Sequence, residues 1–201
     1  PVLSTAENTT TAEWAELVKA VDEAMEMNVP PQRPGAQTLA KRWMTMLMRD
    51  SKGDPRLLAK LNRMHFNEPS VQAQSGVTLD MIAFVQQAYA ETKFAIYEKY
   101  LSPVEMVFMR ENYVSGTSAF PELVAEVYQH LESGTATDDP RVRELTLRWM
   151  ALVRSYAGDD PATQLKLREA MAQHPELLEG SGIDQRLLGY VRQAIAQLKP
   201  H

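Results

Sequence analysis

The sequence predicts an all-α fold in which two similar multi-helix lobes are joined by a long central helix. Apolar residues recur at three- and four-residue intervals along most of the 201 residues, and the alternating pattern of a β-strand is never sustained. With 44% apolar residues, the chain is long enough to bury a sizeable core. A gap-free internal repeat predicts the two lobes.

Proline-marked positions predict where several helices begin. Asp54-Pro55, Asp139-Pro140 and Asp160-Pro161 each place an acidic N-cap before a proline at the first helical position. Ser102-Pro103-Val104-Glu105 predicts a capping box. We expect helices near 11–27, 35–50, 55–66, 78–100, 103–114, 118–133, 140–157, 161–173 and 183–199, with a short helical turn after Pro69 and after Pro175.

The chain matches itself at an offset of 106 residues. Residues 11–89 align with 117–195 without a gap, and 21 of the 79 paired residues are identical. This period exceeds the 20–50 residues of solenoid repeats, which favours duplication of a four-helix unit. The predicted organisation is a polar tail (1–10), a first lobe (11–95), connecting helices (96–116) and a second lobe (117–201).

The repeat separates residues that serve the fold from residues that are free to bind a ligand. Trp43 and Trp149 are paired and identical, so we expect both in the core, together with the paired methionines Met44 and Met150. Other pairs differ in chemistry and are candidates for ligand binding. These pairs are Asn62 and Arg168, His65 and Met171, Phe66 and Ala172, Gln86 and Arg192, and Tyr89 and Ile195.

Two helix faces carry these candidates, because residues three and four apart share one face. The first face holds Asn62, His65 and Phe66, and the second holds Gln86, Tyr89, Lys93 and Tyr97. Aromatic rings with a few polar groups are typical of small-molecule sites, so the two faces are predicted to line a cavity. The alternative for His65 is a half-buried histidine that donates to a helix-end carbonyl.

Composition excludes several classes of function. The formal net charge is −5 and the basic residues are scattered, so we expect no nucleic-acid binding by this chain alone. The sequence has no cysteine, no apolar run near 18 residues and no charged-then-apolar leader. We therefore expect no disulfide, no membrane span and no signal peptide, and we expect a cytoplasmic protein. The four histidines are isolated and nucleotide and hydrolase motifs are missing, so we expect no metal, no cofactor and no catalytic residue.

Several segments resemble a known family. YLSPVEMVFMRENY (100–113) and FPELVAEVYQHLESGTATDDPRVRELTLRWMALVRSYAGDDP (120–161) resemble the thiostrepton-binding TipAS domain, which stands behind MerR-type DNA-binding domains. This likeness covers roughly 98–199. LNRMHFNEP (61–69) and GVTLDMIAFVQQAYAETK (76–93) resemble drug-binding resistance proteins of the same family.

The resemblance implies a binding protein that encloses an elongated, oligoaromatic peptide antibiotic of the albicidin type in a tunnel between its lobes. The drug would be sequestered without being broken, by a monomer or weak dimer that confers resistance. His65 would contact the drug, with Asn62, Gln86, Tyr89 and Tyr97 on the tunnel wall. The other candidate ligand-binding residues are Phe66, Lys93, Tyr113, Tyr156, Arg168, Met171 and Arg192.

Three other functions remain open at this point. The first is a ligand-sensing effector domain of a MerR-type transcription regulator, whose DNA-binding segment would precede Pro1. The second is an enzyme that modifies the drug, which recovery of unchanged ligand would argue against. The third is a helical protein–protein adaptor, which would bind no small molecule.

Overall fold

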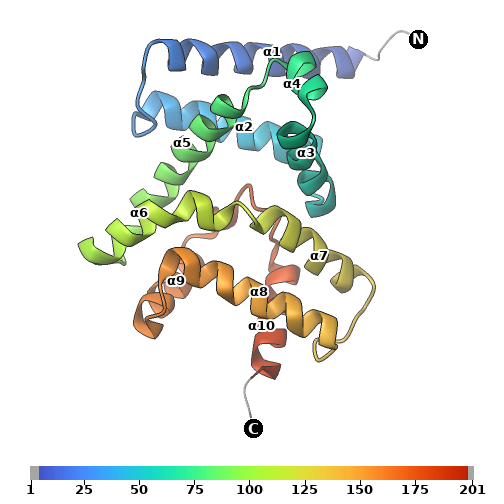
Figure 1. Cartoon of the computed structure of the whole chain (residues 1–201), viewed down its shortest axis with the longest axis vertical. Helices are drawn as coiled ribbons and strands as arrows, with labels where there is room; N and C mark the ends of the chain where they lie inside the picture. Colours follow the sequence, from blue (N-terminus) through green and yellow to red (C-terminus); the bar gives the residue numbers. More distant parts are fainter. Residues whose placement is uncertain (1–4, 199–201) are drawn as a thin grey trace.

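The computed structural model describes residues 5–198, with side chains described from residue 11 onward. Every regular element in this range is helical, which confirms the all-α prediction (Figure 1). The elements are α1 (Thr5–Glu26), α2 (Pro34–Asp50), α3 (Pro55–Asn67), α4 (Pro69–Ser75), α5 (Leu79–Tyr97), α6 (Pro103–Thr117), α7 (Phe120–Glu132), α8 (Pro140–Ala157), α9 (Pro161–Gln173), the 3-10 helix η1 (Pro175–Leu178) and α10 (Gln185–Gln197).

The helix starts follow the local chemistry of the sequence. Asp54, Asp139 and Asp160 each accept a hydrogen bond from the backbone N–H two residues further on, which confirms the three acidic N-caps. Ser102 and Glu105 form the predicted capping box at the start of α6. The caps place α6 and α9 so that Glu105 also binds Lys166 on α9, at 2.8 Å.

Three helix boundaries differ from the prediction by three residues or more. The first helix begins at Thr5, within the expected polar tail. The central helix ends at Tyr97 rather than near residue 100, and α6 ends at Thr117 rather than near residue 114. Residues 1–4 of that tail, and residue 199 as the predicted end of the last helix, lie outside the described residues.

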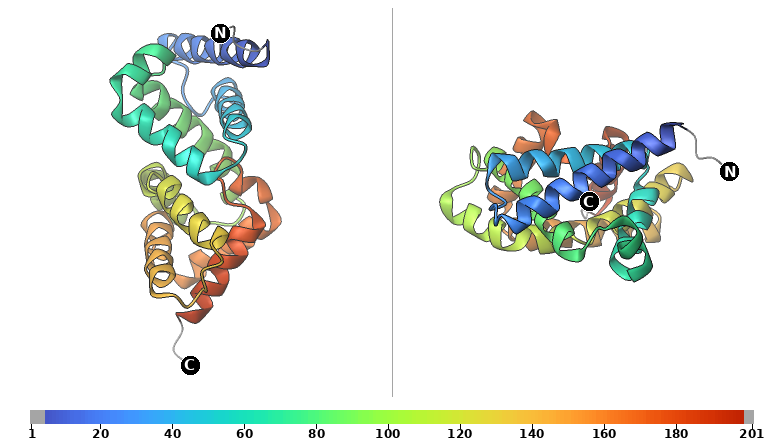
Figure 2. Two further views of the ribbon diagram at one scale, coloured as in Figure 1. Left: turned by 90° about the vertical axis from the view of Figure 1, so that its right-hand side faces the viewer. Right: turned by 90° about the horizontal axis from the view of Figure 1, so that it is seen from above.

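The helices follow the 106-residue interval. Four helix starts of the first half, at Pro34, Pro55, Pro69 and Leu79, recur 106 residues later. The later starts are Pro140, Pro161, Pro175 and Gln185. The first five helices lie at one end of the molecule and the later ones at the other, stacked along its long axis (Figure 2). The common origin of the two halves stays a prediction.

Each lobe has an apolar core built around one tryptophan. In the first lobe, Trp43 is 9% exposed and meets the edge of Trp14 with ring centroids 5.2 Å apart. In the second lobe, Trp149 is 8% exposed and meets Phe120, also at 5.2 Å. Both tryptophans are therefore core residues, as the repeat predicts, and the edge-to-face pairs add to the stabilisation from burial.

Helix α5 belongs to both lobes. Its first half packs Met81, Val85 and Ala88 into the core of the first lobe. Its second half packs Ala90, Phe94 and Tyr97 into a separate core. The other buried residues of that core come from the α5–α6 turn, α6, α8, α9 and η1, namely Leu101, Met106, Met109, Tyr156, Ala157, Leu167, Ala170 and Leu177.

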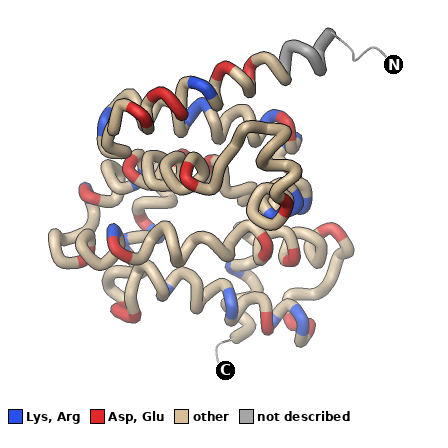
Figure 3. The backbone as a smooth tube through the Cα atoms, turned by 45° about the horizontal axis from the view of Figure 1, so that its top comes forward, with Lys and Arg blue, Asp and Glu red and all other residues tan. Residues whose placement is uncertain are grey.

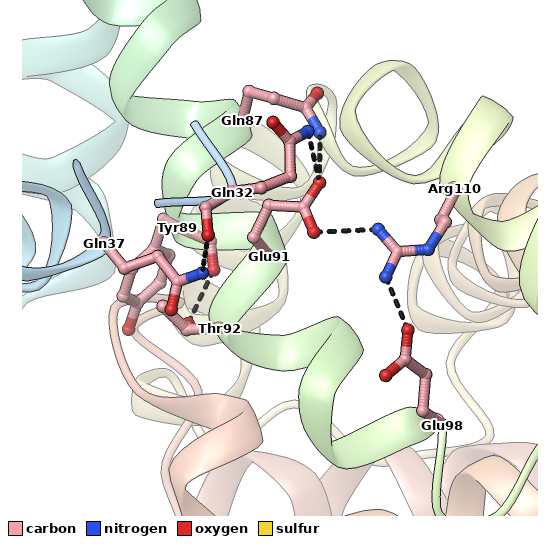
Figure 4. Close-up of polar contacts among 8 residues, drawn as sticks. All are labelled: Gln32, Gln37, Gln87, Tyr89, Glu91, Thr92, Glu98 and Arg110. Carbon is pink, nitrogen blue, oxygen red and sulfur yellow. Dashed lines mark hydrogen bonds and ion pairs between the residues drawn. The ribbon is translucent and has the colours of Figure 1, made fainter. Parts of the chain in front are cut away.

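A buried carboxylate fixes α5 against its neighbours (Figure 4). Glu91 is 6% exposed and accepts from Arg110 of α6 at 2.8 Å, Gln32 of the α1–α2 loop at 3.1 Å and Gln87 at 3.3 Å. Arg110 also binds Glu98 at 2.6 Å, and its guanidinium lies 4.7 Å from the centre of the Phe94 ring. These bonds offset the desolvation of the carboxylate.

Charges of both signs are distributed over the molecule. Lys and Arg positions are spread among Asp and Glu positions on the helices (Figure 3). A surface of mixed sign lacks the continuous basic stripe that attracts phosphate backbones. Within residues 5–198, none of the helices combines the length and the apolar character needed to cross a bilayer.

We predict that Trp149→Ala lowers the free energy of unfolding by roughly 3–5 kcal/mol, because it removes a core side chain and leaves a cavity. Leu147→Ala on the same helix is the control, since Leu147 is 48% exposed, and its effect should stay within about 0.5 kcal/mol. Denaturant unfolding followed by circular dichroism measures both. Equal effects of the two substitutions would contradict the core assignment.

We predict that Glu91→Gln lowers the free energy of unfolding by roughly 1–3 kcal/mol, because a charge-assisted bond to Arg110 is lost inside the fold. The matched control is Glu126→Gln. Glu126 also binds an arginine, Arg148, at 3.0 Å, but in an exposed pair that contributes about 0–1 kcal/mol. Thermal and denaturant unfolding should separate the two variants, and identical curves would contradict the role of Glu91.

Candidate functional site

The segment 179–182 of the second lobe is inserted between α3 and α5 of the first. The backbone carbonyl of Glu179 accepts from the Tyr89 hydroxyl at 2.9 Å and from the Lys93 ammonium at 3.3 Å. A third lobe-to-lobe contact joins Arg63 of α3 to Glu122 of α7 through two hydrogen bonds of 2.7 and 3.1 Å. The interface between the lobes therefore has a polar component besides its apolar contacts.

Two glycines allow this insertion. Gly180 and Gly182 have φ values of +77° and +72°, a backbone conformation that disfavours other residues. A Cβ on Gly180 would lie 3.2 Å from the Tyr89 hydroxyl, and one on Gly182 would lie 3.2 Å from a methyl of Leu58. The segment fits between the two helices because these positions carry no side chain.

A groove of about 780 Å³ borders this segment. Its walls are Met48 near the end of α2, residues 51–54 of the α2–α3 turn, Leu57 of α3, Tyr128 of α7, and parts of the segment from 175 to 185. Glu179 and Gly180 line the groove and also meet Tyr89 and Lys93. The volume falls within the range of about 300–1,000 Å³ typical of small-molecule sites.

A tyrosine cluster lies beside α5. Tyr113 of α6 packs edge-on against Tyr156 of α8, with ring centroids 5.2 Å apart, and lies 6.5 Å from Tyr97. None of the three hydroxyls makes a hydrogen bond with a described residue. Every fully buried side-chain nitrogen or oxygen in the described part has a partner, so each of these hydroxyls retains some access to solvent.

Burial controls the protonation of these groups. It raises the pKa of Tyr89 and Tyr156 to about 12, and it also raises the pKa of Tyr97 and Tyr113, with a further contribution from neighbouring phenols in the last two. Burial lowers the pKa of Lys93 to about 8, although the nearby Glu179 carboxylate opposes this shift. At neutral pH these four phenols are uncharged and Lys93 is a cation.

The structure brings half of the sequence-predicted residues together. Lys93 lies 4.9 Å above the Tyr89 ring, and Met171 packs against the core that holds the tyrosine cluster. This group contains Tyr89, Lys93, Tyr97, Tyr113, Tyr156 and Met171.

The other six predicted residues share no hydrogen bond, ring contact or core cluster with this group. Asn62 and His65 on α3 and Gln86 on α5 are half-buried, and Phe66 is 46% exposed. Arg168 on α9 and Arg192 on α10 are exposed. These six residues remain proposed ligand contacts.

His65 has the local hydrogen bond of the alternative interpretation. Its Nδ1 lies 3.0 Å from the carbonyl of Leu61. Because a carbonyl can only accept, this contact requires the proton on Nδ1 and leaves Nε2 as an acceptor in the neutral ring. The Nε2 atom makes no hydrogen bond with a described residue. A structural bond at Nδ1 and a ligand contact at Nε2 are thus compatible.

Sequence reasoning missed the groove and the inserted segment. Residues of the groove also differ in chemistry from their partners in the internal repeat, which is the criterion used above for candidate ligand-binding residues. Gly180 pairs with Gln74, and Tyr128 pairs with Asp22. These differences were the available signal. Glu91 was missed because a helical glutamate is ordinarily solvated, and only the fold brings Arg110 to it.

Two comparisons relate the chain to known proteins. Residues 4–91 match the TipAS antibiotic-recognition domain. An albicidin resistance protein from Klebsiella oxytoca is 33% identical over 145 residues, which cover 69% of this chain and 63% of that relative. The chain thus spans less than two thirds of the length of this relative. The domain match falls on α1 to α5, whereas the sequence resemblance was placed mainly on 98–199.

We predict that Lys93→Met raises the free energy of unfolding of the ligand-free protein by roughly 1–3 kcal/mol at pH 7, because an apolar side chain replaces a poorly compensated buried cation. Tyr89 still satisfies the Glu179 carbonyl. The pKa of Lys93 is about 8 in the folded protein and 10.5 in the unfolded chain. Between these two pH values the unfolded chain therefore binds more protons than the folded protein. Wild-type stability therefore rises across that window, and the advantage of the variant shrinks.

Denaturant unfolding at pH 7 and pH 9.5 measures this effect. Lys166→Met is the control, because Lys166 has a carboxylate partner in Glu105 at 2.8 Å and its loss should be neutral or destabilising. A Lys93→Met protein that is less stable than wild type at pH 7 would show that the ammonium is well compensated.

Proposed function

Residues 4–91 belong to the TipAS antibiotic-recognition domain family, and from this premise we propose that the protein binds an elongated, oligoaromatic peptide antibiotic such as albicidin between its two lobes. The protein holds the drug without changing it chemically. It confers resistance by lowering the concentration of free drug.

The observation that carries this proposal is the interlobe groove of about 780 Å³, one wall of which belongs to the matched residues 4–91. Its walls come from both lobes, so a bound drug contacts α3 and the segment 175–185 together. The apolar side chains of Leu57, Leu178 and Ile183 and the ring of Tyr128 offer contact area for flat aromatic groups.

Polar groups outside the lining of the groove also suit an amide-linked ligand. The Nε2 atom of His65 is an acceptor in its neutral form, and the cluster of Tyr97, Tyr113 and Tyr156 carries hydroxyls that have no protein partner. A chain of aromatic amides supplies both N–H donors and carbonyl acceptors. Contacts of this kind fix the orientation of a ligand whose affinity comes mainly from apolar burial.

Sequestration works by mass action. A protein that removes a drug without turnover must be present at a concentration above that of the drug and must bind it tightly, with a Kd well below the inhibitory concentration. Binding to the folded state also stabilises it, by about 2.7 kcal/mol when free ligand is at 100 times the Kd. The thermal midpoint should therefore rise with drug concentration.

We predict that albicidin binds saturably to the purified protein. Quenching of tryptophan fluorescence and a rise in the thermal midpoint measure this binding. The drug recovered after long incubation should have an unchanged mass, because the protein holds it without chemistry. No saturation would refute the proposed ligand, and a changed mass would show an enzyme instead.

We predict that His65→Ala weakens albicidin binding by roughly 1–3 kcal/mol, or about 5–150-fold, because one hydrogen bond to the ligand is lost in the complex. The thermal midpoint of the ligand-free protein should stay nearly unchanged. His130→Ala is the control, since His130 bonds Thr135 at 3.2 Å in the α7–α8 turn. A large loss of ligand-free stability in His65→Ala would assign His65 to the fold alone.

A further inference from the structure

The guanidinium of Arg56 on α3 lies over the ring of Tyr128 on α7, 5.2 Å from the ring centre. This contact joins the two lobes, because α3 belongs to the first half of the chain and α7 to the second. A cation over an aromatic ring is attracted by the negative face of its π system. The Tyr128 ring is therefore held from the opposite lobe, and it also packs against the core of its own lobe.

Arg56 is itself fixed by Asp54. The Nε and Nη2 atoms of Arg56 donate to the two carboxylate oxygens of Asp54, at 3.1 and 2.7 Å. Two such bonds fix the plane of a guanidinium as well as its position. Asp54 also accepts from the backbone N–H of Arg56 at 2.9 Å as the N-cap of α3. The start of α3, the guanidinium and the ring of Tyr128 thus form one chain of contacts.

The helix cap by itself does not require the arginine. Asp160 caps α9 in the same way, by accepting from the backbone N–H of Ala162 at 2.8 Å, and Ala162 is the repeat partner of Arg56. Tyr128 also differs from its own repeat partner, Asp22. Neither the acidic cap nor the helix pattern of the two halves therefore explains the pair of Arg56 and Tyr128.

Tyr128 is the aromatic member of the groove wall. Among the described residues, no other aromatic side chain lines the groove. Arg56 does not line it, so the face of the ring that the guanidinium covers is not the part that borders the groove. An aromatic ring offers a flat ligand group a stacking or edge-to-face contact beyond apolar burial. The aliphatic residues Leu57, Leu178 and Ile183 offer burial alone, which is non-directional.

We propose that Tyr128 makes the groove select flat aromatic groups over aliphatic ones, and that Arg56, held by Asp54, is the residue that positions its ring. This inference rests on the proposed function, because it names the residues that recognise the rings of the ligand in the groove. A ring that is fixed before the ligand arrives loses less freedom on binding. Loss of Arg56 therefore weakens the stacking contact although Arg56 does not touch the ligand.

The test compares two neutral probes that differ only in their rings. The first is a trimer of 4-aminobenzoic acid, acetylated at its amino end and closed as a carboxamide. The second has cyclohexane rings in place of the benzene rings, so it is at least as apolar but cannot stack. Calorimetry measures both Kd values for the wild-type protein at pH 7. We expect the aromatic probe to bind about three- to ten-fold more tightly.

Substitution of the tyrosine should remove this preference. In Tyr128→Leu the two probes should bind within about two-fold of each other, because an aliphatic side chain gives both the same kind of contact. Tyr128→Phe keeps the ring and should keep the preference. Thermal unfolding of both ligand-free variants checks that they fold.

Arg56→Gln should reduce the preference at least two-fold, because the ring loses its support from α3. Arg141→Gln is the matched control. Arg141 pairs with Asp139 in a second Asp-Pro-Arg sequence, through bonds of 3.0 and 2.9 Å, but it lies over none of the described aromatic rings. This control should keep the full preference. Both arginines are exposed, so the thermal midpoints of the two ligand-free variants should be alike.

The outcomes separate this inference from the proposed function. Equal affinities of wild type for the two probes, absence of binding by both, or a preference that survives in Tyr128→Leu overturns the role of Tyr128. A preference that is unchanged in Arg56→Gln overturns the role of Arg56. If albicidin itself still binds in these cases, sequestration stands. If wild type selects the aromatic trimer through Tyr128 but does not bind albicidin, the named drug is wrong and the aromatic contact stands.

Discussion

Two buried charges of opposite sign lie two residues apart on α5, and the helix geometry prevents them from neutralising each other. The carboxylate of Glu91 faces α6 and the α1–α2 loop, where Arg110 and two glutamines satisfy it. The ammonium of Lys93 faces the second lobe, where one backbone carbonyl meets it. Glu91 thus ties α5 to α6 and to the α1–α2 loop. Lys93 leaves an incompletely compensated cation at the interface between the lobes.

The division into two lobes follows from where the apolar residues are. Trp43 and Trp149 each anchor a core of their own, and a third core forms where α5 meets α6, α8 and α9. Apolar packing therefore joins the lobes on the side of α5 and α6. On the other side the segment 175–185 meets the α2–α3 turn across a groove. The groove, which we propose as the ligand site, lies where residues of both lobes face each other.

The interface between the lobes contains polar groups that cost stability. A lysine buried with one long hydrogen bond, and tyrosine hydroxyls without partners, are weaker contributors to folding than apolar residues of the same size. Such features concentrate at functional sites, where the missing partner is a ligand.

The sequence by itself determined the helices, their caps and both core tryptophans, because these depend on local chemistry and on the spacing of apolar residues along the chain. It also selected Tyr89, Lys93, Tyr97, Tyr113 and Tyr156, which the fold brings together. Only the tertiary structure decided that Arg110 reaches Glu91, that Glu179 meets Lys93, and that a groove opens beside Tyr128. The two hydrogen bonds join residues 19 and 86 positions apart, and the groove joins surfaces of both lobes. No local pattern encodes which of many polar side chains will meet once the lobes pack.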